Sequence, residues 1–187
     1  MASRISKKTW IILAIVIIAV GAIVGIALGR SSSIPSDSTP QSQTALNFTL
    51  PTMTGVNITL SELEGTPVVL NFWSISCPYC RVQLPYLEDV AQQSEVRIKV
   101  IAVNIVDAAA SLQKFFGDYE PAMIIALDSN GETFVNYCQN YGNLGGNIPF
   151  TLFVDSEGVI QYKRIGAFSS ETELWDTLHS VFGITIP

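Results

Sequence analysis

The sequence predicts a three-layer α/β domain that follows a single membrane-spanning helix. Two observations lead to this fold class. An uncharged apolar run lies near the N-terminus, and farther along, apolar strand-like segments alternate with amphipathic segments before a final hairpin and helix. A chain of 187 residues has room for one compact domain besides the apolar run.

The apolar run covers residues 10–29 and reads WIILAIVIIAVGAIVGIALG. At the rise of an α-helix, a run of this length crosses a hydrocarbon layer about 30 Å thick. Three cations precede it and only Arg30 closely follows it, so residues 1–9 are expected in the cytoplasm and the remainder outside. The three cations are Arg4, Lys7 and Lys8. The alternative is a signal peptide cut near Gly29, although the apolar part of such peptides is usually shorter.

Residues 30–45 are predicted to be a flexible linker, because they are rich in Ser, Pro and Gln and poor in residues that pack into a core. The folded domain is then expected over residues 46–187. Beyond residue 30, six Lys and Arg side chains stand against sixteen Asp and Glu, a formal net charge of −10. Such an acidic domain lacks the basic face that binds phosphate backbones, which excludes nucleic acid as a partner.

The first elements of the domain follow from the apolar pattern. Residues 48–60 alternate around Thr54-Gly55, which predicts a β-hairpin. Residues 68–73, VVLNFW, form an apolar run typical of a central strand covered on both faces. A helix is expected to begin at the cysteines that follow and to be kinked, not ended, by Pro85. Its inward face would carry Val82, Leu84, Leu87, Val90 and Ala91.

The remaining elements alternate strand and helix. Asp107 is expected to cap a helix that ends at Gly117 and whose inward face carries Leu112, Phe115 and Phe116. Ser170 and Glu173 form a capping-box pattern at the start of the last helix. The predicted strands are 96–106, 122–127, 150–155 and 159–165, and a further helix is predicted at 132–141.

Cys77 and Cys80 lie where the central strand gives way to a helix. The unpaired N–H groups and the positive end of the helix dipole would stabilise a Cys77 thiolate, so Cys77 is expected to attack substrate. Cys80, one turn farther, would be shielded and would resolve the mixed disulfide. Pro78 and Tyr79 between them help to set the reduction potential.

Two other uses of the cysteines were considered. A structural zinc site would need further ligands, for which only Cys138 and His179 remain, and no metal site is predicted. A purely structural disulfide closing so short a loop would constrain the unfolded chain little. Cys138 is expected to be a buried apolar side chain, and His179 is expected on the surface.

The run LSELEGTPVVLNFWSISCPYCRVQLPYL resembles the active-site region of the membrane-anchored thioredoxin-like proteins of the TlpA and ResA type, within the redoxin superfamily. The resemblance extends over roughly residues 46 to 182 and includes the leading hairpin, Pro85, and Ile148-Pro149 before FTLFVD. It implies a thioredoxin fold with an added N-terminal β-hairpin. It also implies that Pro149 is cis beside the disulfide and that Ile148 and Pro149 bind the backbone of a partner peptide.

Three positions near the cysteines depart from this resemblance. Ser76 stands where relatives usually have Trp, Gln83 where many have a Glu that moves protons, and Asn71 where thioredoxin has a buried Asp. Trp73 is expected in the core beside the disulfide. With neither carboxylate present, the Cys80 thiol would lose its proton to water or to Cys77.

Together these features predict an extracytoplasmic thiol-disulfide oxidoreductase that reduces cysteines of exported proteins, for which cytochrome c maturation is the family's best-known use. No cofactor beyond the disulfide is predicted, so a membrane electron donor is implied. Two alternatives remain open: a thiol peroxidase of the redoxin type, and a non-catalytic thiol module that binds metal.

Overall fold

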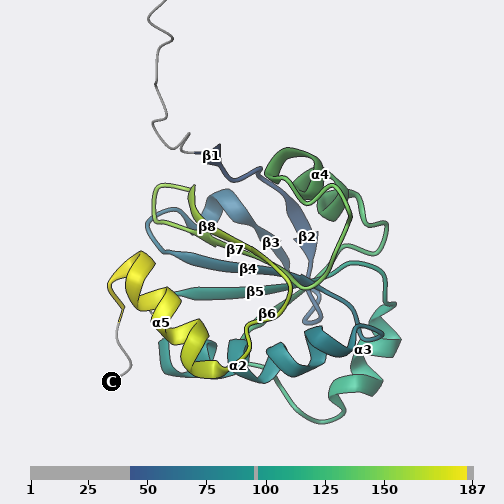
Figure 1. Ribbon diagram of the computed structural model, residues 1–187. Coiled ribbons are helices and arrows are strands. Elements are labelled where there is room, and N and C mark those ends of the chain that lie inside the picture. The colour runs from purple at the N-terminus through teal and green to yellow at the C-terminus, as the bar shows by residue number, and fades with distance from the viewer. Residues whose placement is uncertain (1–42, 95–96, 185–187) are drawn as a thin grey trace, which may run out of the picture. The chain divides into compact units, whose positions relative to one another are not determined.

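A six-stranded mixed sheet forms the middle layer of the computed structural model, which describes residues 43–94 and 97–184 (Figure 1). The strand order is β1-β8-β7-β4-β5-β6. Strands β4 (Val68–Trp73), β5 (Lys99–Asn104) and β6 (Ile124–Leu127) run parallel, whereas β7 (Phe150–Val154) and β8 (Val159–Ile165) pair antiparallel. The predicted α/β class is confirmed; β4 and β8 have the predicted bounds, whereas β5, β6 and β7 are shorter than predicted.

Helices cover both faces of this sheet (Figure 1). Helices α2 (Pro78–Ser94) and α5 (Glu171–Phe182) pack on one face, with Leu112 of α3 (Ala109–Phe116) joining the same core. Helix α4 (Glu132–Tyr141) packs on the other face together with Phe48, Leu50 and Leu60. Strand β4 is therefore buried on both sides, which explains why its sequence is apolar without alternation.

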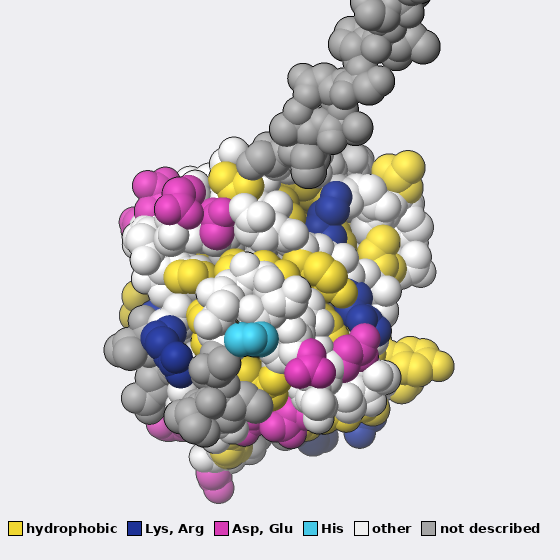
Figure 2. Space-filling model, turned by 60° about the vertical axis from the view of Figure 1, so that its left-hand side comes forward, with side chains coloured by type: hydrophobic (Ala, Val, Ile, Leu, Met, Phe, Trp, Pro, Cys, Tyr) yellow, Lys and Arg dark blue, Asp and Glu magenta, His cyan; other side chains and the backbone are white. Residues whose placement is uncertain are grey.

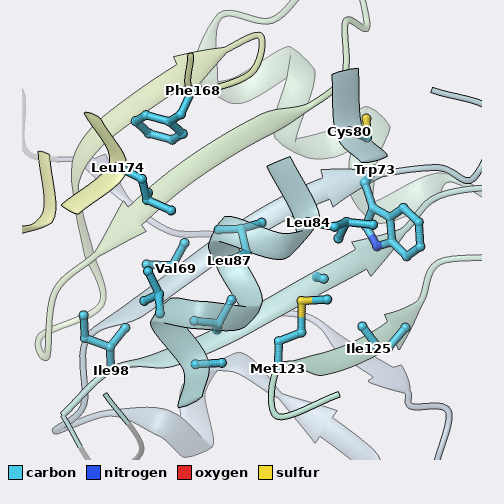
Figure 3. Packing of buried hydrophobic residues seen from close by; sticks show 14 of the residues in the cluster. Val69, Trp73, Cys80, Leu84, Leu87, Ile98, Met123, Ile125, Phe168 and Leu174 are labelled. Atoms are coloured by element: carbon cyan, nitrogen blue, oxygen red, sulfur yellow. The ribbon is translucent and has the colours of Figure 1, made fainter. Parts of the chain in front are cut away.

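The core beneath α2 holds both cysteines of the pair, and Cys80 is labelled in Figure 3. Side chains on alternate positions of a strand point to opposite faces, so Val69 and Trp73 of β4 face α2 while Phe72 faces α4. In Figure 3, Cys80 and Ile98 lie toward opposite ends of this core. Both cysteines are thus part of this core and do not form a small separate cluster.

The predicted N-terminal hairpin is confirmed. Strand β2 (Thr49–Pro51) pairs antiparallel with β3 (Asn57–Thr59), and a short 3-10 helix, η1 (Leu60–Leu63), follows. Beyond the hairpin's first strand, the Met53 N–H donates to the Ile125 carbonyl oxygen at 3.0 Å. The hairpin therefore covers part of the exposed edge of β6, which limits unwanted strand pairing there.

The predicted linker is shorter than its composition indicates. Gln43 and Thr44 form strand β1, whose register places them opposite Ile160 and Val159 of β8. The Ala45 N–H also donates to the Gly158 carbonyl oxygen at 2.9 Å. Strand pairing at a sheet edge uses backbone groups, so polar residues such as Gln and Thr serve as well as apolar ones.

Two predictions about helix surfaces were wrong. Val82 was expected to face inward but is 54% exposed, whereas Leu84, Leu87, Val90 and Ala91 are buried. Phe115 of α3 is also partly exposed. Helix α2 continues through Pro85, as expected. Val82 lies outside the buried face of α2 because it is two positions from Cys80 and from Leu84, about half a turn from each.

The proposed membrane helix at residues 10–29 and most of the linker lie outside the described residues. Within residues 43–94 and 97–184, no helix has the length and apolar character needed to cross a bilayer.

Candidate active site

The Cys77–Cys80 pair is a disulfide at the junction between β4 and α2. Its two Cα atoms are 5.3 Å apart. The side chain of Cys77 is 9% exposed and that of Cys80 is 1% exposed. A reactant from solvent therefore meets the Cys77 sulfur first, and Cys80 lies beneath it.

The start of α2 places one backbone donor on the Cys77 sulfur. The Cys80 N–H donates to Cys77 Sγ at 3.1 Å, and the Arg81 N–H donates to the Cys77 carbonyl oxygen at 3.2 Å. The first N–H groups of a helix have no partner within the helix, and they favour negative charge. The same geometry would stabilise a Cys77 thiolate after reduction of the disulfide.

Asp107 holds the loop that leads to Cys77, a role that the sequence did not reveal. Its carboxylate accepts hydrogen bonds from the Ile75 N–H at 2.8 Å and from Asn104 Nδ2 at 2.9 Å. The prediction that Asp107 caps α3 was wrong, because the N-cap is Ala108 and no side chain caps that end. Parallel strands β4 and β5 end at the same sheet edge, so the two following loops meet there.

The loop before β7 brings a second backbone segment to the disulfide. The Ile148-Pro149 bond is cis, as the resemblance implied, and Pro149 is buried. The Ile148 carbonyl oxygen is 3.7 Å from Cys77 Sγ. The Pro149 carbonyl oxygen accepts the Gly166 N–H at 2.8 Å, which fixes the segment on its far side. An extended partner peptide could therefore reach the Ile148 backbone and Cys77 together.

A neutral polar cluster lies beneath the pair. Gln83 is fully buried, its Nε2 donates to Thr151 Oγ1 at 3.0 Å, and its Oε1 accepts the Phe168 N–H at 3.0 Å. Asn71 is directly opposite Thr151 in the β4–β7 register, and its buried Nδ2 has no hydrogen-bond partner among the described residues. Neither Gln83 nor Asn71 can titrate, so the residues at these positions offer no carboxylate to accept the Cys80 proton.

The other predicted site residues divide into exposed and buried ones. Ser76, Pro78 and Tyr79 are exposed, and the Tyr79 side chain is 71% accessible. Ser76 Oγ is 3.1 Å from Ser74 Oγ. Trp73 is fully buried, and its ring packs on Phe115 and Phe116 of α3. The exposed residues next to Cys77 are therefore one serine, one proline and one tyrosine.

Cys138 and His179 lie apart from the disulfide. Cys138 is a free, buried cysteine in the α4 core, on the opposite face of the sheet from Cys77 and Cys80. Burial raises the pKa of the Cys138 thiol, a shift that the side chain of Asn143 partly opposes. The single histidine of the chain, His179 on α5, is exposed (Figure 2). The structure does not bring these residues together with the pair.

Comparisons with known proteins agree with this site. A family model described as AhpC/TSA matches residues 42–163. The chain is 29% identical over 170 residues to the thiol-disulfide oxidoreductase ResA of Halalkalibacterium halodurans, covering 88% of this chain and 90% of that protein. It is 32% identical over 121 residues to the thiol:disulfide interchange protein DsbE of Pseudomonas fluorescens, covering 64% and 63%.

Solved structures show the same fold. A crystal structure from Chlorobium tepidum, assigned as a thiol:disulfide interchange protein DsbE, superposes with a TM-score of 0.62. The two sequences are 25% identical, and the match covers 73% of this chain and 92% of that one.

Proposed function

This chain belongs to the AhpC/TSA family and is a thiol-disulfide oxidoreductase, and from this premise we propose that it reduces disulfides of exported proteins through Cys77 and Cys80. The observation that carries the proposal is the asymmetry of the pair. Cys77 is the more accessible sulfur and receives the Cys80 N–H at 3.1 Å, while Cys80 is buried. One helix start thus supports an attacking sulfur and a resolving sulfur.

The reaction begins with the reduced pair. The Cys77 thiolate attacks one sulfur of a substrate disulfide, a Cys77–substrate disulfide forms, and the other substrate sulfur leaves as a thiolate that takes a proton from water. The Cys80 thiol then loses its proton and attacks Cys77 Sγ, which releases the second substrate thiolate. Two electrons have moved to the substrate, and the Cys77–Cys80 disulfide remains.

Regeneration of the reduced pair requires a thiol donor. We place the redox domain outside the cytoplasm, held by residues 10–29 in a single-pass membrane helix with residues 1–9 in the cytoplasm. A membrane thiol-disulfide reductase would then supply electrons through exchange at Cys77, without another cofactor. Apocytochrome c is one candidate substrate, since its haem-binding cysteines must be reduced before haem attaches.

The test is exchange by the full-length protein and three Cys→Ser variants. With insulin as the disulfide substrate and dithiothreitol as the reductant, Cys77→Ser should abolish catalysed reduction. When the reduced Cys80→Ser variant is mixed with insulin after dithiothreitol has been removed, it should accumulate a mixed disulfide that mass spectrometry detects, because the resolving sulfur is missing. Cys138→Ser is the matched control and should retain the wild-type rate. Full activity in Cys77→Ser would disprove the assignment.

The reduction potential of the pair tests the direction of electron flow. A value near that of thioredoxin, about −270 mV, supports a reductant, whereas one near that of DsbA, about −120 mV, would indicate an oxidant. Peroxide consumption tests the alternative enzyme class. A peroxidase would consume hydrogen peroxide faster than it reduces insulin, and the opposite order is expected here.

A further inference from the structure

We propose that Asn143 is a positioning residue that fixes the backbone of Ile148 for substrate binding, an inference that rests on the proposed function. Asn143 lies in the loop between α4 and the cis-proline, outside any helix or strand. Its neighbours in this loop are mostly exposed, yet Asn143 itself is only 1% exposed. A buried polar side chain in an exposed loop indicates a specific set of partners.

Those partners are the backbone groups of Asn147, four residues later, besides the buried Cys138 thiol, which the Asn143 side chain also contacts. Asn143 Nδ2 donates to the Asn147 carbonyl oxygen at 2.8 Å, and Asn143 Oδ1 accepts the Asn147 N–H at 3.1 Å. The backbone of Asn143 is also held, because its N–H donates to the Cys138 carbonyl oxygen at 3.0 Å and its carbonyl accepts the Gly146 N–H at 2.8 Å. Asn143 thus ties the end of α4 to the residue that precedes Ile148.

The bond to the Asn147 carbonyl sets the orientation of the next peptide plane. In a trans peptide, the carbonyl oxygen and the following N–H point in opposite directions. Because the Asn147 carbonyl points to Asn143, the Ile148 N–H must point away from Asn143. That N–H donates to no backbone group of the described residues, so it is available to a partner.

The site is fixed on both sides of Ile148. Asn143 holds Asn147 upstream, and the Gly166 N–H holds the Pro149 carbonyl oxygen downstream. Between these anchors, the Ile148 carbonyl oxygen lies 3.7 Å from Cys77 Sγ. Asn143 therefore affects the alignment of an extended peptide with the reactive sulfur, without touching substrate or sulfur itself.

Only an amide side chain can make both bonds. Asp at this position would still accept the Asn147 N–H, but its second oxygen would face the Asn147 carbonyl oxygen, with no proton to share at neutral pH. Ala would remove both bonds. Asn143→Asp and Asn143→Ala thus remove the donor that sets the peptide plane, the first at nearly constant side-chain volume.

The test compares two substrates in the full-length protein. One is a small aromatic disulfide, 5,5′-dithiobis(2-nitrobenzoate), which has no peptide backbone, and the other is an extended peptide that carries one disulfide. Both variants should react with the small disulfide within about twofold of the wild-type rate. Their kcat/KM for the peptide should fall about tenfold, mostly through KM, as expected for one misplaced hydrogen bond to the substrate backbone. Asn140→Ala is the matched control, since Asn140 is exposed on α4 and bonds only within that helix.

A second measurement does not depend on turnover. In a Cys80→Ser background that traps the peptide, amide hydrogen exchange at Ile148 should slow on trapping, and Asn143→Asp should reduce that protection. Equal losses with both substrates would mean that Asn143 only stabilises the fold, and wild-type rates in both variants would also overturn the inference. If the wild-type protein itself failed to reduce the peptide, the proposed function would be wrong as well.

Discussion

At the scale of single residues, Gln83 shows how the site satisfies its buried polar groups with hydrogen bonds. The side chain joins α2 to β7 and to the Phe168 backbone through two hydrogen bonds, with Thr151 Oγ1 and the Phe168 N–H. A neutral amide satisfies both groups at any pH, whereas a carboxylate could accept only one of the two bonds unless the partner hydroxyl turned. With no carboxylate at positions 71 and 83, we expect the proton that Cys80 releases on attacking the mixed disulfide to pass to water or to the departing substrate thiolate.

Gln83→Glu should make stability depend on pH. A protonated Glu can donate to Thr151 and accept from Phe168, so the variant should resemble wild type near pH 5. Burial raises a carboxyl pKa, and the folded state then holds its proton at pH values where the unfolded state has lost it. The free energy of unfolding should fall by about 2–4 kcal/mol between pH 5 and pH 8, at about 1.4 kcal/mol per unit of pKa shift.

Urea unfolding at the two pH values measures this loss. Gln113→Glu, an exposed position on α3, is the control and should show the wild-type dependence on pH. A Gln83→Glu protein whose stability does not change between pH 5 and pH 8 would show that water or a turned Thr151 hydroxyl satisfies the carboxylate.

At the scale of secondary-structure elements, the Glu88 carboxylate ties helix α2 to the segment before β6. Glu88 accepts hydrogen bonds from the Ala122 N–H at 2.8 Å, the Met123 N–H at 3.2 Å and the Tyr119 hydroxyl at 2.7 Å, all on the segment before β6. Burial raises the pKa of Glu88, but the bonds from Ala122, Tyr119, Met123 and Gln92 outweigh burial and hold that pKa below its usual value. The active-site helix is thereby fixed to the segment that leads into the edge strand β6.

Glu88→Gln should destabilise the protein at neutral pH, and this destabilisation should disappear at acidic pH. Since the folded-state pKa of Glu88 is below the unfolded value, its contribution is present above the unfolded pKa and is lost as pH falls through the folded pKa. At pH 7 the variant should lose about 1–3 kcal/mol, because a buried N–H is left without an acceptor. The difference from wild type should shrink toward pH 3, and the exposed Glu62→Gln should show no such difference at either pH.

At the scale of the whole molecule, tyrosines of α4 hold the N-terminal segment of the described domain. The Tyr141 hydroxyl accepts the Leu46 N–H and donates to the Thr44 carbonyl oxygen, each at 2.7 Å, and the Tyr137 hydroxyl donates to the Leu46 carbonyl oxygen at 2.5 Å. These bonds span 91 to 97 residues of sequence. They fix the segment through which the chain enters the folded domain.

Tyr141→Phe should loosen the chain segment at residues 44–46 without altering the disulfide site. Loss of the hydroxyl leaves the Leu46 N–H and the Thr44 carbonyl without that partner, and about 1–2 kcal/mol of stability should be lost. Amide exchange at Leu46 should accelerate, while exchange activity at Cys77 stays within about twofold of wild type. Tyr79→Phe, whose hydroxyl is exposed, is the stability control. Unchanged exchange at Leu46 in Tyr141→Phe would contradict the role given to the hydroxyl.

The site itself is assembled only at this largest scale. Residues 74–80 follow β4, Asn104 and Asp107 lie at the end of β5, and Ile148-Pro149 precedes β7. Parallel β4 and β5 end, and antiparallel β7 begins, at one edge of the sheet, so three distant segments of the chain meet around Cys77.

The sequence by itself determined the elements and the sulfur pair. Apolar runs such as VVLNFW predict buried strands because burial depends mainly on each residue's own side chain. Cys77 and Cys80 could be recognised as a pair because only two residues separate them in the sequence. Only the tertiary structure showed that Asp107 holds the Ile75 N–H, that Asn143 holds Asn147 beneath the surface, that Gln43 and Thr44 join the sheet, and that Val82 faces solvent. Each of these depends on which backbone group or surface lies nearby, and that is decided by how the elements pack, not by their composition.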